Sequence, residues 1–169
     1  MPELTPLSYL VLGLIDRAGQ ATPYELKQMA GSISGLWALR HDQVYRETAG
    51  LAELGLLSEE REEGGRRRRR FRTNEAGRRE LRNWLEAPTA QFTELHDVGL
   101  LQLFLGADPK ALAKVQLNAH EERLQEYEEW TEQLGPESPE GARLALESGV
   151  GHEREWVRFW GRVADRDQE

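Results

Sequence analysis

The stretch GGRRRRRFRTNEAGRRELRNWL, residues 64–85, decides the fold of this chain. Gly64–Gly65 is a two-residue hairpin signal, so residues 66–73 are predicted to be the returning strand of a β-hairpin. Strand alternation puts Arg66, Arg68, Arg70 and Arg72 on one face, with Arg67, Arg69 and Phe71 on the other. A helix follows from about Asn74, with Leu81, Trp84 and Leu85 on its apolar side, and Pro88 ends it.

Three helices are expected before the hairpin. Thr5 and Pro6 form an N-cap and first-turn pair, and the apolar face of this first helix comprises Leu7, Leu10, Val11, Leu14 and Ile15. Thr22 and Glu25 are spaced as a capping box for a short second helix, which a connector over residues 31–35 follows. The third helix runs over about residues 40–54, with a buried stripe at Val44, Thr48, Leu51 and Leu54.

This order of elements, three helices and an Arg-rich hairpin followed by a fourth helix, is that of a winged helix-turn-helix over residues 1–87. A helix fits the DNA major groove, where polar residues on its first exposed turns can contact base edges. His41, Asp42, Gln43 and Arg46 are predicted to lie on this solvent side of the third helix. An Arg-rich ribbon is suited to the phosphate backbone or the minor groove. Double-stranded DNA is therefore the expected partner.

Residues 88–169 are predicted to form long acidic helices over about residues 94–105, 109–134 and 139–163. The rest of the chain is too short to cover both sides of such helices, so we expect a helical dimerisation domain in a homodimer. Apolar residues at helical spacing are the candidate dimerisation residues, namely Leu112, Val115, Leu124, Tyr127, Leu146, Val150, Val157 and Trp160. The predicted fold class is mainly α.

Composition limits the classes of function. The chain has 169 residues and no cysteine, which excludes disulfide scaffolds and thiol catalysis. Residues 1–87 carry 14 basic and 13 acidic side chains, whereas residues 88–169 carry 8 and 17, so the basic charge is localised. The longest apolar stretch, residues 9–15, is far too short to span a membrane, and no basic segment of a secretory signal precedes it. We expect a cytoplasmic protein without membrane contact.

No catalytic motif is present. The four histidines, 41, 96, 120 and 152, lack metal-binding spacing and are predicted to be exposed helix residues. No nucleophile elbow, phosphate loop or dinucleotide fingerprint occurs. The sequence therefore predicts no enzyme activity, catalytic residue, cofactor or metal.

Several segments together resemble the PadR-like transcriptional regulators. TPYEL (22–26) is similar to that family's His-Gly-Tyr-Glu-Leu pattern, with Pro23 in place of Gly. HDQVYRETAGLAELGLL (41–57) resembles its Gln-Leu-Tyr-Pro segment and the turn that follows, with Arg46 in place of Pro. Residues 64–85 resemble its wing and fourth helix. LLQLFLG (100–106) and HEERLQEYEEW (120–130) are similar to its helical dimerisation region.

The resemblance implies a bacterial repressor that an effector releases from a near-palindromic operator. It implies DNA contacts at Tyr24, Gln43, Tyr45 and the wing arginines. Because some relatives bind flat aromatic ligands between subunits, a small aromatic effector is also implied. The full set of candidate DNA-binding residues is Tyr24, Lys27, His41, Gln43, Tyr45, Arg46, Arg66, Arg67, Arg68, Arg69, Arg70 and Arg72.

Other interpretations remain open. The Arg strip is also compatible with a solvated strand edge, and Tyr24 and Tyr45 with packing residues. Trp84, Trp130, Trp156 and Trp160 favour core or dimer packing over an effector pocket. An alternative function is a helical protein–protein adaptor whose basic strip docks an acidic partner without specific DNA binding.

Overall fold

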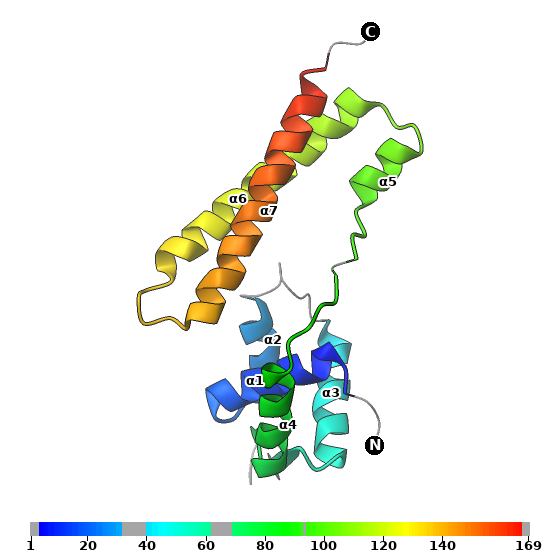
Figure 1. The fold of residues 1–169 in the computed structure, drawn as a ribbon. Helices are drawn as coiled ribbons and strands as arrows, with labels where there is room; N and C mark the ends of the chain where they lie inside the picture. Colours follow the sequence, from blue (N-terminus) through cyan, green and yellow to red (C-terminus); the bar gives the residue numbers. More distant parts are fainter. Residues whose placement is uncertain (1–3, 32–39, 62–68, 93, 167–169) are drawn as a thin grey trace. The chain divides into compact units, whose positions relative to one another are not determined.

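The computed structural model describes residues 4–31, 40–61, 69–92 and 94–166, and for His41 it describes the backbone alone (Figure 1). The chain divides into two units, unit 1 (Met1–Gln91) and unit 2 (Phe92–Glu169). Several expected features lie outside the described residues: most of the 31–35 connector, the Gly64–Gly65 turn, and Arg66, Arg67 and Arg68.

Helix α1 (Pro6–Ala18) begins and ends where the caps predict. The Thr5 hydroxyl accepts a hydrogen bond from the Ser8 backbone N–H at 3.3 Å, and Gly19 ends the helix with φ +74°. Its buried side chains are Ser8, Val11, Leu12 and Ile15. The predicted apolar face is therefore rotated, because Leu12 lies in the core whereas Leu7, Leu10 and Leu14 are only half-buried.

Helices α2 (Pro23–Gly31) and α3 (His41–Glu53) follow. The α3 stripe of Val44, Thr48 and Leu51 is buried, as its spacing predicts. The prediction is wrong for Leu54, which is exposed because the helix ends at Glu53 and Leu54 is its C-cap. Gly55 then reverses the chain with φ +70°, a backbone conformation that glycine adopts readily.

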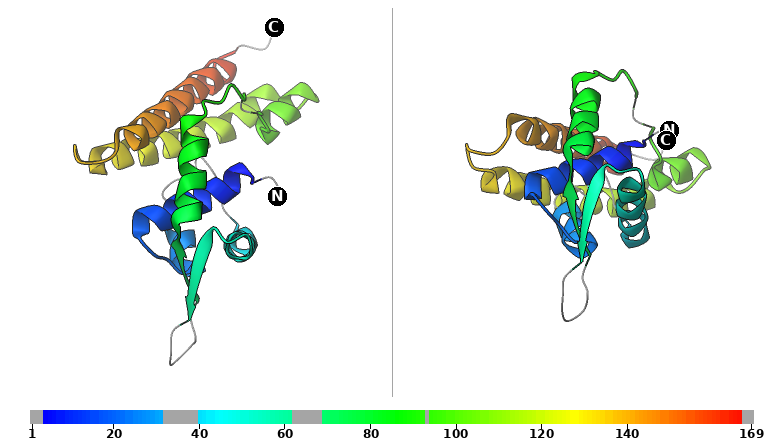
Figure 2. Two further views of the ribbon diagram at one scale, coloured as in Figure 1. Left: turned by 60° about the horizontal axis from the view of Figure 1, so that its bottom comes forward. Right: turned by 90° about the horizontal axis from the view of Figure 1, so that it is seen from below.

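The hairpin pairs β1 (Leu57–Arg61) with β2 (Arg69–Thr73) in antiparallel register, from Leu57 opposite Thr73 to Arg61 opposite Arg69. Figure 2 shows these strands projecting from the helices of unit 1. Ala21 and Phe71 exchange both backbone hydrogen bonds, at 2.9 and 3.0 Å, which attaches β2 to the segment between α1 and α2. Phe71 is buried in a core with Val11, Leu26, Val44 and Leu51, among others.

Helix α4 (Glu75–Glu86) begins at Asn74, whose side chain accepts from the Gly77 N–H at 3.0 Å. Leu81 is buried, but Trp84 and Leu85 are exposed, so only part of the predicted apolar side lies in the core. The reason is local: Trp84 stacks on the Tyr9 ring of α1, with centroids 4.6 Å apart, at the edge of the core.

Unit 2 contains α5 (Val98–Phe104), α6 (Pro109–Gln133) and α7 (Glu140–Ala164), with α6 and α7 packed side by side (Figure 1). Helix α5 is shorter than the predicted 94–105 because Asp97 caps it, accepting from the Leu100 N–H at 2.7 Å. Helix α7 is continuous through Gly149 and Gly151. Its core with α6 contains Ala113, Trp160 and Val163.

These elements confirm the predicted fold class: the chain is mostly helical with one small antiparallel sheet, and its first unit is a winged helix. Among the described helices, none combines the length and the apolar character that crossing a bilayer requires.

Candidate nucleic-acid interface

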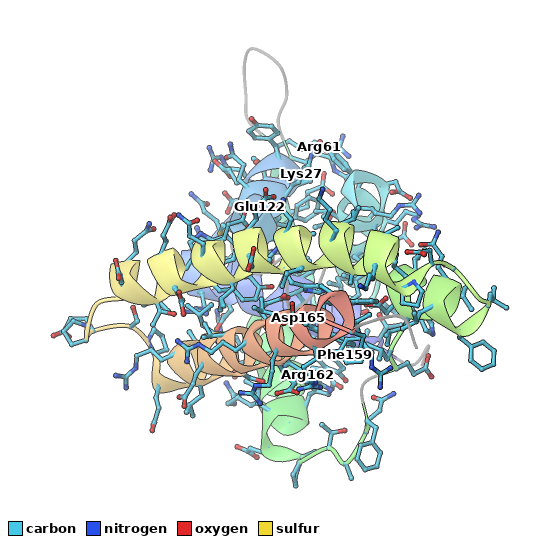
Figure 3. The ribbon with its side chains drawn as sticks, turned by 90° about the horizontal axis from the view of Figure 1, so that it is seen from above. Lys27, Arg61, Glu122, Phe159, Arg162 and Asp165 are labelled. Carbon is cyan, nitrogen blue, oxygen red and sulfur yellow. The ribbon has the colours of Figure 1, made fainter. Side chains whose placement is uncertain are left out.

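Helix α2 presents two candidate residues to solvent. A reciprocal cap fixes its start, because the Glu25 carboxylate accepts from the Thr22 N–H at 2.7 Å and the Thr22 hydroxyl accepts from the Glu25 N–H at 3.3 Å. Tyr24 and Lys27 are then exposed. Figure 3 shows Lys27 on α2 and Arg61 on β1 toward the same end of unit 1. The exposure of Tyr24 removes the simplest reason for an aromatic residue there, which is core packing.

The start of α3 depends on Gln43. Its amide oxygen accepts the Arg40 N–H at 3.0 Å, which satisfies one of the backbone donors that a helix N-terminus leaves unpaired. The Gln43 side chain is half-buried as a result. A candidate residue for base contact therefore also supports the helix that would carry it. The sequence hides this role because Arg40, rather than Ser or Thr, occupies the N-cap.

Two guanidinium groups surround one carboxylate on the first turns of α3. Asp42 pairs with Arg40 (Nε to Oδ1, 3.2 Å) and with Arg46 (Nη2 to Oδ2, 3.4 Å). Both arginine side chains are about three-quarters exposed, so they remain accessible to an anionic partner. Tyr45 is exposed on the same helix. The sequence does not single out Arg40, because spacing alone does not distinguish a cation at an N-cap from one in a loop.

The described part of the wing shows the expected strand alternation. Phe71 and Thr73 are buried, Arg69 lies on their face of the hairpin, and Arg70 and Arg72 lie on the other. Arg72 donates to Gln20 at 3.4 Å, and Arg70 lies 3.9 Å from Glu25. An open pocket of about 450 Å³ adjoins Arg70, lined also by Ala18, Gln20, Ala21, Glu25, Gln28 and Met29.

Glu59 on β1 binds two arginines. Its carboxylate accepts two bonds from Arg69, Nε at 2.8 Å and Nη2 at 2.6 Å, and one from Arg61 Nε at 2.9 Å. The Arg69 guanidinium also lies over the Phe71 ring, 5.2 Å from its centroid. These hydrogen bonds from Arg69 and Arg61 lower the pKa of Glu59 from 4.5 to about 2. Motifs in the sequence do not indicate Glu59, although the strand register makes it a neighbour of Arg69.

Three of the eight candidate dimerisation residues are buried inside unit 2. Trp160 is fully buried, and Tyr127 and Val150 are nearly so, all within a single chain. Leu112, Leu124, Leu146 and Val157 are half-buried, whereas Val115 is exposed. Val115 is therefore accessible to a second chain, whereas the fully buried Trp160 is not. Helical periodicity cannot separate these cases, because packing within a chain and between chains produces the same stripe.

A different apolar surface is exposed around α5. It consists of Phe92, Leu95, Val98, Leu101, Phe104 and Leu105, each between 55% and 94% exposed. We call these six side chains the α5 surface. Leu100 and Leu103, on the other side of the helix, pack against the unit 2 core. Several large exposed apolar side chains close together in the sequence are typical of a protein interface.

The histidines differ from the prediction in one case. His120 is half-buried, with Nδ1 2.6 Å from the Glu153 carboxylate and its ring stacked on Trp156, so the expectation of an exposed residue is wrong there. His96 and His152 are exposed. In the described part of the chain, no three His, Cys, Asp or Glu residues are grouped to hold a metal ion.

Residues 11–83, which include most of α1, all of α2, α3 and the wing, and most of α4, match the model of the transcriptional regulator PadR-like family. The match covers the winged-helix part of the chain. The family is one of transcriptional regulators, so the match agrees with the resemblance that the sequence analysis predicts. No curated protein matches the chain.

Solved structures extend the PadR-like fold over nearly the whole chain. Bacillus subtilis PadR in complex with operator DNA is 21% identical, with a TM-score of 0.81 over 95% of this chain and 98% of that one. The same protein in complex with p-coumaric acid is also 21% identical, with a TM-score of 0.74 over 94% of this chain and 96% of that one. The Vibrio cholerae virulence activator AphA is 22% identical, with a TM-score of 0.69 over 94% of this chain and 95% of that one. At these identities the likeness establishes the fold.

Proposed function

We propose that this PadR-like chain is a sequence-specific DNA-binding transcriptional regulator that acts as a homodimer in the bacterial cytoplasm. The observation that carries the proposal is the cationic hairpin, which the Ala21–Phe71 bridge fixes to the same small core that positions α3. A ribbon and a helix held in one rigid unit can contact backbone and major groove together. The operator complex of Bacillus subtilis PadR supports this function.

The proposed base-reading element is the first half of α3. His41, Gln43 and Arg46 start this helix beside exposed Tyr45, and Tyr24 and Lys27 on α2 are the proposed backbone contacts. Phosphate binding orients a protein on the duplex, whereas base-edge contacts select the sequence. We therefore assign sequence preference to α3 and general affinity to α2 and the wing.

The wing arginines are proposed to contact phosphate. Arg70 and Arg72 lie on the face of the hairpin that does not carry Phe71, and Arg66 to Arg70 form an unbroken basic run in the sequence. Five consecutive cations repel one another, and a polyanion would offset that repulsion. An adaptor with a basic docking strip would not require Gln43 and Arg46 on a separate helix beside the wing.

The homodimer is proposed to form through unit 2, with the α5 surface and Val115 against a second copy. Stable interfaces bury about 1,200–2,000 Å² in total with an apolar centre, and the α5 surface supplies large side chains for such a centre. A two-fold dimer binds a near-palindromic operator with half-sites about 10 bp apart or a multiple of that spacing.

We further propose a repressor that a small aromatic effector releases from DNA. The p-coumaric acid complex of Bacillus subtilis PadR supports an effector of this class. Trp130 and Trp156, both half-buried in unit 2, offer aromatic rings to such an effector. Quenching of Trp fluorescence across planar aromatic acids tests this part; a flat response throughout would contradict it.

The deciding experiment is a titration of the purified chain against duplex DNA from its own upstream region and against a scrambled duplex, at several salt concentrations. We expect tight binding that discriminates against the scramble and weakens by about 10³–10⁵ between 50 and 200 mM salt if 6–10 phosphates are neutralised. Equal affinity for both duplexes would reduce the function to general polyanion binding. Absence of binding at 50 mM salt would contradict the proposal in favour of the adaptor.

A further inference from the structure

The base of the wing contains an internal counter-ion. Glu59, Arg61 and Arg69 share one face of the hairpin, because Glu59 lies opposite Phe71 and Arg61 lies opposite Arg69 in the register. One carboxylate thus neutralises one of the two guanidinium charges, Arg61 and Arg69, that the described strands carry on this face. Arg70 and Arg72 of β2 lie on the opposite face. The local positive charge is reduced where the proposed function needs it.

The pair between Glu59 and Arg69 is geometrically strong. Two short parallel hydrogen bonds join them, and the Glu59 side chain is only 21% exposed, so solvent screens the attraction less than at an open surface. The Phe71 ring beneath Arg69 further restricts the guanidinium. Arg61, 72% exposed, makes a single bond to the same carboxylate. A DNA phosphate must therefore displace Glu59 to bind the Nε and Nη2 edge of Arg69.

We propose that Glu59 limits the DNA affinity of this protein by holding Arg69 and Arg61 in competition with phosphate. This inference rests on the proposed function. Because phosphate contacts carry no sequence information, the restraint acts on operator and non-operator DNA alike and sets absolute affinity rather than preference. Its benefit is that fewer molecules are retained on the large excess of non-specific sites in a chromosome.

The test compares Glu59→Gln with a matched control, Glu60→Gln. Both remove one negative charge from adjacent positions of β1, but Glu60 lies on the opposite face of the hairpin. In the part of the chain that the structure describes, Glu60 forms no ion pair. Glu60 lies opposite Arg70, so Glu60→Gln measures the effect of removing a charge from the hairpin, and only Glu59→Gln releases Arg69 and Arg61.

We expect Glu59→Gln to bind both the operator and the scrambled duplex about 5–10-fold more tightly at 0.1 M salt, with a slope of log K against log salt steeper by about 1. Glu60→Gln, which removes a charge opposite Arg70 but breaks no pair with Arg69 or Arg61, should strengthen binding clearly less than Glu59→Gln. Glu59→Asp, which keeps the charge but shortens the reach, should give an intermediate gain and serves if Glu59→Gln does not fold.

Three outcomes overturn the proposal. Weaker binding by Glu59→Gln would mean that Glu59 orients the arginines for phosphate. Equal effects of Glu59→Gln and Glu60→Gln would mean that only net charge matters. If the unmodified chain binds neither duplex at 50 mM salt, the proposed function itself fails, and this result is distinct from normal binding with an unresponsive Glu59→Gln.

Discussion

The Tyr127 ring on α6 lies against Gly149 on α7 so closely that a Cβ at position 149 would be 2.9 Å from the ring. Separations this short do not occur in well-packed interiors, so the close packing of α6 on α7 at this point requires glycine, which has no Cβ. Gly151, one half-turn further along the same helix, has open space where its Cβ would lie. The two glycines of α7 therefore have different roles, although nothing in the sequence distinguishes them.

Gly149→Ala should destabilise unit 2 by about 1–3 kcal/mol, since the Tyr127 ring must shift to admit the methyl group. Gly151→Ala, the matched control, should stabilise the helix by about 0.5–1 kcal/mol through helix propensity. Urea unfolding followed by circular dichroism measures both. Equal effects of the two substitutions would show that Tyr127 does not constrain the helix pair.

The low pKa of Glu59 predicts a pH-dependent contribution to stability. Its pKa is about 2 in the folded chain against 4.5 ordinarily, so pairing with Arg69 stabilises the fold fully above about pH 4.5. The contribution is lost as the pH falls toward 2. The difference in unfolding free energy between the unmodified chain and Glu59→Gln should shrink over that interval. A carboxyl ¹³C titration of Glu59 with a midpoint near 4.5 would contradict this.

Replacing Arg70 and Arg72 together with Ala should weaken binding to every DNA sequence and flatten the salt slope by about 1 for each phosphate that is no longer neutralised. Both arginines lie on the wing face that does not carry Phe71. Arg143→Ala with Arg162→Ala, on α7, removes the same charge from unit 2 and is the control. If the two double variants behave alike, the wing does not bind DNA.

Position 43 can separate support of α3 from base contact. Gln43→Glu keeps an acceptor for the Arg40 N–H, so α3 should stay intact while preference among operator variants changes. Gln43→Ala removes both functions and should also cost about 1 kcal/mol of stability. Binding to a set of single-base operator variants, with thermal unfolding alongside, distinguishes them. An unchanged preference in Gln43→Glu would remove Gln43 from the proposed reading residues.

The α5 surface predicts the effect of charge at its centre. Leu101→Glu with Phe104→Glu should convert the proposed dimer to a monomer, because two buried carboxylates per chain carry a large desolvation cost. Leu85→Glu, at an exposed leucine of α4, is the control and should leave the association state unchanged. Sedimentation equilibrium measures the outcome. A persistent dimer in the double variant would place the interface elsewhere.

Local signals predicted much of the fold from the sequence. Thr5, Thr22 and Asn74 were predicted as helix starts because a cap acts within three residues. Contacts between residues that are distant in the sequence were harder to predict. The Glu59–Arg69 pair depends on the hairpin register, and the burial of Trp160 depends on how α6 and α7 pair within one chain. Periodicity alone could not choose between that pairing and a second copy.

The hydrogen bond from the Arg40 N–H to Gln43 also constrains how this protein can diverge. A side chain at position 43 must carry an acceptor of the same reach, or α3 loses part of its first turn. Substitutions that preserve the helix are thus confined to a narrow chemical set, with glutamate the nearest to glutamine. In a lineage of such proteins, new binding preferences would arise more readily from Tyr45 or Arg46, whose side chains project into solvent.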